Sequence, residues 1–236
     1  MIDFKDILEK GDITKLEGGD DNHTFLLTYK NKKYVLRNYK NKKITNYYWD
    51  LCKKVERYNF TPKVYYKKDN KLILEYIKRR DCKKSDSLKV AERVGKICSI
   101  INKINVTKET PKTQNDILYA MKILKNKKVF PKDILNNLEE IYLKSQKELG
   151  TKYAIDFDDV YPENFRLKKG KIYLVDIDGI DYKFRGRGIG KGFLRWFKTD
   201  KERAKFKKGY ESISSLNFLT PDYLQFLYLN FLLFSV

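Results

Sequence analysis

Acidic and amide side chains able to hold a metal ion are concentrated in one short stretch of this sequence. Asp156, Asp159 and Asn164 lie within nine residues of one another, and Asp176 and Asp178 follow a nearby apolar segment. Crowded carboxylates raise one another's pKa values unless a cation lies among them. Mg²⁺ takes hard oxygen ligands of this kind together with phosphate oxygens. The cluster therefore indicates phosphate chemistry at a magnesium ion.

The spacing of these residues is more specific than their crowding. Asn164 lies five residues after Asp159, and Asp176 lies twelve residues after Asn164. Kinase-type phosphotransfer needs one carboxylate to orient the acceptor hydroxyl, and an amide and a second carboxylate to hold the metal. We therefore predict that Asp159 is catalytic and that Asn164 and Asp176 bind the metal, while Asp178 either assists them or caps a turn. The alternative is two acidic turns that only cap a hairpin.

The elements that must position these residues fall into two parts. Hydrophobic patterning predicts strands over 24–28, 33–37, 64–67 and 71–76, with a helix over 44–58. It then predicts helices over 86–104, 114–126 and 131–149, a strand pair at 165–167 and 172–175, and further helix from about 188. We expect an α+β chain with a small β-rich lobe, residues 1–78, and a larger helical lobe, residues 79–236.

The catalytic motifs resemble the kinase-like fold, on the side that holds aminoglycoside and choline phosphotransferases, lipopolysaccharide sugar kinases and archaeal RNA kinases. The catalytic loop of that group is roughly His-Gly-Asp-x-x-x-x-Asn, followed after a strand by Asp-x-Asp/Glu. Asp159, Asn164 and Asp176 match these positions, and Phe157-Asp158 stands in place of His-Gly. The resemblance covers about residues 14 to 215 and implies a bilobal protein-kinase-like enzyme that uses ATP and Mg²⁺.

The N-terminal part resembles the nucleotide-binding segments of the same group. Its glycine turn resembles a phosphate-covering turn, the strand after it carries a cation for the phosphates, and main chain after 74 would meet adenine. The implied cofactor-binding residues are Gly18, Gly19, Asn22, Arg37, Glu75 and Ile77. A helix carboxylate usually orients the strand cation, and both Asp50 and Glu56 are candidates for this role beside Arg37.

Two further features are assigned no catalytic role. The segment 186–192 resembles a P-loop but fails the GxxxxGK[ST] spacing, so we interpret it as a flexible basic segment. The three cysteines include no CxxC pair, which argues against a disulfide scaffold or structural zinc and favours a cytoplasmic location. The apolar run 226–236 is shorter than the roughly 20 residues of a membrane span, so we expect a last core helix and no membrane insertion.

Charge bears on the acceptor. The 236 residues contain 51 Lys and Arg against 31 Asp and Glu, a net charge of +20, which favours an anionic partner. After the metal motif, basic residues alternate with aromatic ones, a pattern typical of RNA binding. The predicted RNA-binding residues are Arg185, Arg187, Lys191 and Arg195. The alternative is a solvated helix face with core aromatics.

These observations favour one acceptor over several others. Positive charge argues against cationic acceptors such as aminoglycosides and choline. The resemblance to archaeal RNA kinases implies a ribose 2′-hydroxyl of structured RNA such as tRNA, and we expect no DNA partner. A Kdo-like lipopolysaccharide sugar or a small molecule is the alternative acceptor. A kinase-like module that binds RNA without catalysis is the second alternative.

Overall fold

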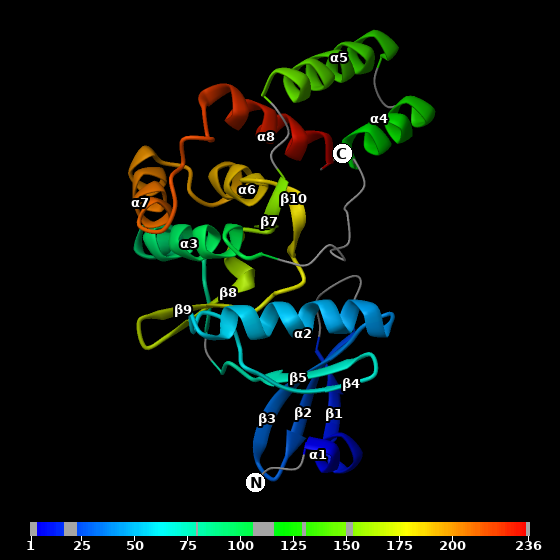
Figure 1. Ribbon diagram of the computed structural model, residues 1–236, viewed down its shortest axis with the longest axis vertical. Helices are drawn as coiled ribbons and strands as arrows, with labels where there is room; N and C mark the ends of the chain where they lie inside the picture. The colour runs from blue at the N-terminus through cyan, green and yellow to red at the C-terminus, as the bar shows by residue number, and fades with distance from the viewer. Residues whose placement is uncertain are drawn as a thin grey trace. The chain divides into compact units, whose positions relative to one another are not determined.

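A computed structural model of the chain describes residues 4–16, 23–78, 80–105, 116–128, 131–149 and 153–234. The chain divides into two compact units, whose elements are labelled in Figure 1. The first unit comprises Met1–Asp81 and Phe165–Asp178, and the second comprises Cys82–Asn164 and Gly179–Val236. This division differs from the predicted boundary between residues 78 and 79, because the later segment 165–178 groups with the N-terminal residues.

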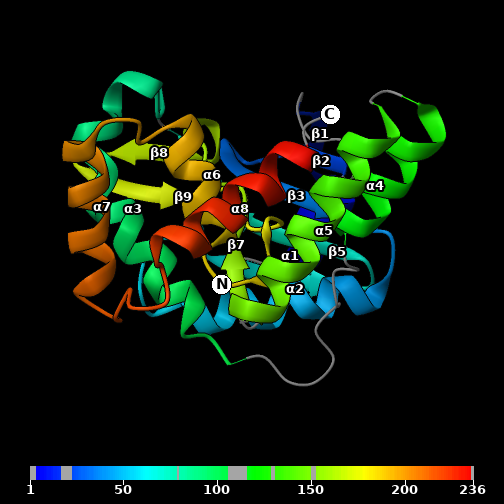
Figure 2. The same ribbon diagram turned by 90° about the horizontal axis from the view of Figure 1, so that it is seen from above.

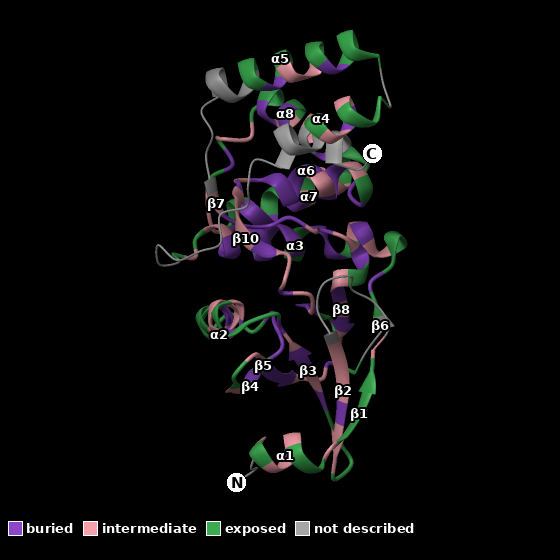
Figure 3. Cartoon of the chain, turned by 90° about the vertical axis from the view of Figure 1, so that its right-hand side faces the viewer, coloured by how far each residue is buried: buried purple, intermediate pink, exposed green. Residues whose placement is uncertain are grey.

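The first unit is built on a five-stranded antiparallel sheet in the order β1-β2-β3-β5-β4. The strands are β1 (Asp12–Lys15), β2 (His23–Tyr29), β3 (Lys32–Asn38), β4 (Val64–Lys68) and β5 (Lys71–Glu75). Lys30 and Asn31 both have positive φ, 46° and 60°, as a tight hairpin turn between twisted strands requires. The four predicted strands of this sheet are confirmed. The sequence missed β1, because this exposed edge strand has no buried residue to give it an alternating pattern (Figure 3).

Two helices cover this sheet. In α2 (Lys42–Glu56), Asn41 caps the first turn by accepting a hydrogen bond from the Ile44 amide at 3.0 Å. The side of α2 that carries Leu51 and Val55 is buried. α1 (Phe4–Lys10) contributes Ile7 to a separate cluster with strand residues. That cluster consists of Ile7, Leu27, Tyr34, Leu36 and Ile73.

The segment 165–178 joins this unit through main-chain pairing. Its hairpin consists of β8 (Phe165–Lys168) and β9 (Lys171–Leu174), and the short β6 (Arg80–Asp81) pairs with β8. The Leu174 amide donates to the Phe60 carbonyl at 2.8 Å. These bonds link residues about a hundred positions apart, so hydrophobic patterning could not assign the hairpin to this unit.

Helices dominate the second unit, together with the strand pair β7 (Tyr153–Phe157) and β10 (Ile180–Phe184). The helices are α3 (Ser87–Asn102), α4 (Asp116–Lys127), α5 (Lys132–Leu149), α6 (Arg187–Arg195), α7 (Asp200–Glu211) and α8 (Pro221–Phe234). α4 and α5 both pack against α8 (Figure 2). A core cluster beside them contains Tyr142, Phe184, Tyr223, Phe226 and Leu227.

α8 confirms the interpretation of the C-terminal apolar run as a core helix, since Phe226 and Leu227 are buried in this cluster. Within the described ranges, no helix is both long enough and apolar enough to cross a membrane. The interpretation of residues 186–192 as a flexible basic segment is wrong. They form the start of α6, in which Gly188, Gly190 and Gly192 are buried against neighbouring elements.

α3 and α7 lie side by side (Figures 1 and 2) and approach closely because two glycines face the partner helix. A Cβ atom on Gly95 would lie 2.1 Å from the Phe206 carbonyl oxygen. A Cβ atom on Gly209 would lie 1.8 Å from the Glu92 carbonyl oxygen. Neither helix backbone can yield locally, so a side chain at either position must push the helices apart.

Replacing Gly95 by alanine should therefore destabilise the protein by about 1–3 kcal/mol, the usual cost of overpacking a close contact. Urea denaturation followed by circular dichroism gives the free energy of unfolding. Lys96→Ala is the matched control, because Lys96 is the next residue of the same helix and is exposed. Equal stability of Gly95→Ala and wild type would contradict this account of the helix contact.

Candidate functional site

In the second unit, Asp159 and Asn164 occupy one tight loop that follows β7. The Asn164 amide nitrogen donates to the Asp159 carboxylate at 2.5 Å and to the Asp159 carbonyl oxygen at 2.8 Å. A short 3-10 turn, Pro162–Asn164, brings the amide back to the carboxylate. The Asp159 side chain remains 42% exposed, so a substrate can reach it. The structure thus brings together the predicted catalytic carboxylate and one predicted metal ligand.

Asp158, the residue before Asp159, is buried and surrounded by cations. Its Oδ2 atom lies 2.8 Å from Lys183 Nζ, 3.7 Å from Arg187 Nε and 3.9 Å from Lys191 Nζ. Burial alone would raise the pKa of Asp158, but these cations outweigh burial and lower it. Lys191 Nζ also lies 4.0 Å from Asp159 Oδ1. A buried carboxylate thus holds three cations next to the candidate catalytic residue.

A second buried carboxylate, Asp156 on β7, holds the main chain at the start of α6. It accepts hydrogen bonds from the amides of Gly186 and Gly188 and from the Asn102 side chain. Burial raises the pKa of Asp156 to about 6, against the lowering effect of these hydrogen bonds. Gly188 must be glycine here, because a Cβ atom would lie 1.8 Å from the Phe157 carbonyl oxygen.

Phe157 packs this loop in place of the His-Gly pair that is typical of the kinase-like enzymes. Its ring is buried, and a Cβ atom on Gly179 would lie 2.8 Å from it. The Asp158 amide donates to the Gly179 carbonyl at 3.2 Å, which continues the pairing of β7 with β10. Apolar packing and main-chain pairing therefore hold this loop.

In the first unit, Arg37 on β3 is buried against the Asp-x-Asp motif. Its guanidinium forms ion pairs with Asp176, at 3.2 Å, and with Asp178, and donates to the Val175 carbonyl at 3.1 Å. Burial opposes the charge, but the two carboxylates and the nearby Tyr39 raise the pKa of Arg37 well above its ordinary value. The Arg37 guanidinium therefore stays charged, and these contacts fix its orientation.

The prediction that a carboxylate of α2 lies beside Arg37 is wrong. Neither Asp50 nor Glu56 was found beside it: Asp50 is exposed, and Glu56 pairs with Lys53 at 3.1 Å. The carboxylates beside Arg37 come instead from Asp176 and Asp178, 139 or more residues away in sequence. Sequence spacing gives no information on such a pairing.

Two tyrosines that the sequence analysis missed complete this network. The Tyr39 hydroxyl donates to Asp178 Oδ1 at 2.9 Å, and the Tyr48 hydroxyl donates to the Asp178 carbonyl at 2.8 Å. Their rings stack with centroids 5.1 Å apart. Asp178 therefore acts as a junction between β3, α2 and the metal motif, which favours a supporting role over a simple turn cap.

Each unit contains an oxygen donor of the kind that a hard divalent cation prefers. The Asp176 side chain is 39% exposed, and one of its oxygens is held by Arg37. Asn164 donates through its nitrogen to Asp159, which leaves its carbonyl oxygen as the atom able to bind a cation. Mg²⁺ is usually held by one or two such side chains together with phosphate oxygens. Among the residues that the structure describes, His, Cys, Asp and Glu form no metal-binding group of three or more.

The remaining predicted nucleotide residues are only partly described. Gly18, Gly19 and Asn22 lie outside the described residues. The Glu75 amide donates to the Lys63 carbonyl at 2.8 Å, and the buried Ile77 accepts a weak hydrogen bond from Arg166 at 3.4 Å. The proposed contact of this main chain with adenine stays a prediction.

The residues predicted to bind RNA do not form one exposed patch. Arg187 is only 6% exposed and Lys191 is half-buried, both beside Asp158. Arg185 stacks on Phe218 at 4.2 Å, whereas the exposed Arg195 lies over Phe231 at 4.5 Å. The interleaved aromatics Phe184, Phe193 and Trp196 are buried and cannot stack on bases. The alternating pattern therefore reflects largely the packing of α6.

No family model and no curated protein matches the sequence. Solved structures nevertheless share its fold. An ethanolamine kinase from Plasmodium vivax is similar with a TM-score of 0.72 and 17% identity, covering 98% of this chain and 78% of the kinase. A choline kinase from Streptococcus pneumoniae has a TM-score of 0.70 and 15% identity, covering 98% and 85%. An aminoglycoside phosphotransferase has a TM-score of 0.63 and 16% identity, covering 88% and 80%. These similarities confirm the α+β, protein-kinase-like fold.

The raised pKa of Asp156 predicts a pH dependence of stability. Between the unfolded value of 3.8 and the folded value of about 6, the folded protein keeps a proton that the unfolded chain has lost. Asp156 therefore costs stability as the pH rises through this window. The free energy of unfolding of wild type minus that of Asp156→Asn should fall by roughly 2–4 kcal/mol between pH 4 and pH 7.

Urea denaturation of both proteins across this pH range measures that difference. The subtraction removes the titration of the other carboxylates, which the two proteins share. A difference that is constant or rises with pH would contradict the assignment of Asp156 as a buried carboxylate that ionises at a cost.

Proposed function

We propose that this chain is an ATP-dependent phosphotransferase that moves the γ-phosphoryl group to a hydroxyl acceptor. The observation that carries the proposal is the exposed Asp159 carboxylate held by the Asn164 amide, in a chain with the fold of small-molecule kinases. A carboxylate so held can accept a hydrogen bond from an acceptor hydroxyl and orient its oxygen for attack.

The other residues divide the remaining tasks. Asn164 and Asp176 would hold Mg²⁺, which when bound neutralises negative charge on the phosphates. Arg37 holds the Asp176 carboxylate in one direction, since its guanidinium contacts Asp176, Asp178 and main chain together. Contact of Arg37 with nucleotide phosphate remains a further part of the proposal.

Charge around Asp159 favours an acceptor that is not cationic. Lys183, Arg187 and Lys191 lie against Asp158, and Lys191 Nζ also lies 4.0 Å from Asp159 Oδ1. Choline and aminoglycosides carry positive charge, so the Lys191 ammonium beside Asp159 disfavours them as acceptors. A net charge of +20 over the chain acts in the same direction.

We therefore propose an anionic acceptor, first the ribose 2′-hydroxyl of structured RNA such as tRNA. The exposed Arg195 and the lysine-rich surface support it, because basic groups gain affinity for RNA by releasing counterions. A Kdo-like lipopolysaccharide sugar is the second acceptor with matching charge.

Transfer of labelled γ-phosphate from ATP and Mg²⁺ to tRNA, lipopolysaccharide, choline and an aminoglycoside tests the function. Asp159→Asn keeps the size of the side chain but removes its charge, and should lower turnover by about 10²–10⁴-fold. Glu163→Gln is the matched control, because Glu163 is an exposed carboxylate of the same loop. It should retain turnover within about twofold.

The outcomes separate the parts of the proposal. Label on tRNA that depends on Asp159 supports the RNA acceptor. Label only on lipopolysaccharide or on a small molecule keeps phosphotransfer and overturns the RNA acceptor. Equal turnover in Asp159→Asn and wild type overturns the catalytic assignment. Tight RNA binding with no label on any acceptor favours the non-catalytic RNA-binding module.

A further inference from the structure

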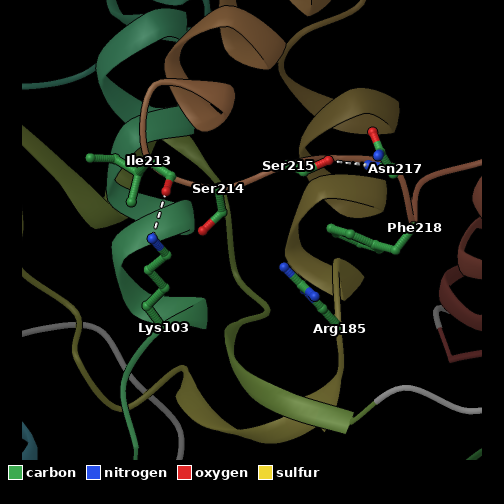
Figure 4. Close-up of a pocket in the computed structure, with 7 residues that line it drawn as sticks. All are labelled: Lys103, Arg185, Ile213, Ser214, Ser215, Asn217 and Phe218. Atoms are coloured by element: carbon green, nitrogen blue, oxygen red, sulfur yellow. Dashed lines mark hydrogen bonds between the residues drawn. The ribbon is translucent and has the colours of Figure 1, made fainter.

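A pocket in the second unit lies among α3, the segment after β10 and the segment that joins α7 to α8 (Figure 4). It is a shallow depression, largely open to solvent, with a volume of about 590 Å³. The lining residues are Lys103, Arg185, Ile213, Ser214, Ser215, Asn217 and Phe218. They offer two cations, two hydroxyls and an amide, and none of them carries a carboxylate.

Packing fixes the Arg185 guanidinium at this pocket. The Arg185 Cζ atom lies 4.2 Å from the centroid of the Phe218 ring, which covers it. The Tyr223 hydroxyl donates a hydrogen bond to the Arg185 carbonyl at 2.9 Å. Arg185 Nε is buried with no hydrogen-bond partner in the part of the chain that the structure describes. In Figure 4 the guanidinium and the Ser214 hydroxyl point toward the same space. A guanidinium so oriented presents a planar set of donors to a ligand.

Lys103 supplies the second cation from the C-terminal end of α3. Its ammonium donates to the Ile213 carbonyl at 2.6 Å, which holds it against the pocket wall. Within the described ranges no carboxylate pairs with Lys103 or Arg185. Among the described residues no carboxylate offsets the charge of these two groups, whereas Lys183 and Arg187 both pair with Asp158.

We propose that this pocket binds a phosphate group, supplied by inorganic phosphate or by a small phosphate monoester. A phosphate dianion accepts several hydrogen bonds at once and suits a wall whose polar side chains are cations, hydroxyls and an amide. The ligand contacts Arg185, Lys103 and the segment 213–218 and does not contact Asp159. The site is thus independent of the proposed phosphotransfer function, and it gives Arg185 a role other than RNA binding.

Nuclear magnetic resonance of the ¹⁵N-labelled full chain tests the site. Inorganic phosphate is titrated at constant ionic strength against a chloride control, and glycerol phosphate and dimethyl phosphate are titrated in parallel. Amide resonances of residues 213–218 and the Arg185 Nε–H resonance should shift saturably with one dissociation constant. The diester, which has a single charge, should bind at least tenfold more weakly than inorganic phosphate.

Two variants separate the site from general attraction to a basic surface. Arg185→Gln and Lys103→Gln should each weaken phosphate binding at least tenfold, and Lys103 is exposed, so its variant keeps the fold if Arg185→Gln does not. Lys96→Gln, an exposed lysine of the same helix, should leave binding unchanged. Unsaturable shifts spread over many lysines, or unchanged affinity in Lys103→Gln, would overturn the proposal. So would binding of an RNA oligonucleotide at these resonances without binding of inorganic phosphate.

Discussion

The buried guanidinium of Arg37 must be neutralised by carboxylates, and the first unit is organised around this requirement. A buried charge without a partner is strongly destabilising. Asp176 and Asp178 meet the need, and they arrive on the segment after β9. The ion pairs thereby attach a segment from the middle of the chain to β3. The same contacts set the direction of the carboxylate that we propose as a metal ligand.

The carboxylates near the Asp159 loop of the second unit are of two kinds, buried and exposed. Asp156 and Asp158 are both buried. Asp156 accepts hydrogen bonds from nearby amides, and Asp158 pairs with nearby cations. Asp159 stays exposed, accepts a hydrogen bond from the Asn164 amide and lies 4.0 Å from Lys191 Nζ. Two acids are therefore buried in structural contacts, and the one that we propose as catalytic remains accessible.

The cationic side chains that the structure describes also fall into two groups, those with a carboxylate partner and those without one. Some cations pair with a carboxylate within the protein, as Arg187 and Lys183 do with Asp158. Others, such as Lys103 and Arg185, line a pocket that contains no acid. A count of basic residues along the sequence does not distinguish these two groups, although cations without a carboxylate partner attract an anion more strongly. Net charge consequently argues for an anionic partner without identifying the surface that meets it.

The sequence by itself determined what depends on neighbours along the chain. The strands around the turn at Lys30 and Asn31, the helix capped by Asn41 and the loop that joins Asp159 to Asn164 all follow from short-range pattern or spacing. The tertiary structure alone decided what depends on distant residues. It gave Arg37 its partners 139 or more positions away, placed the hairpin of β8 and β9 in the first unit, and buried Arg187 against Asp158. Buried charges need an opposite charge, and buried strand edges need hydrogen-bond partners. Folding can supply these partners from any part of the chain, so the local sequence pattern does not predict them.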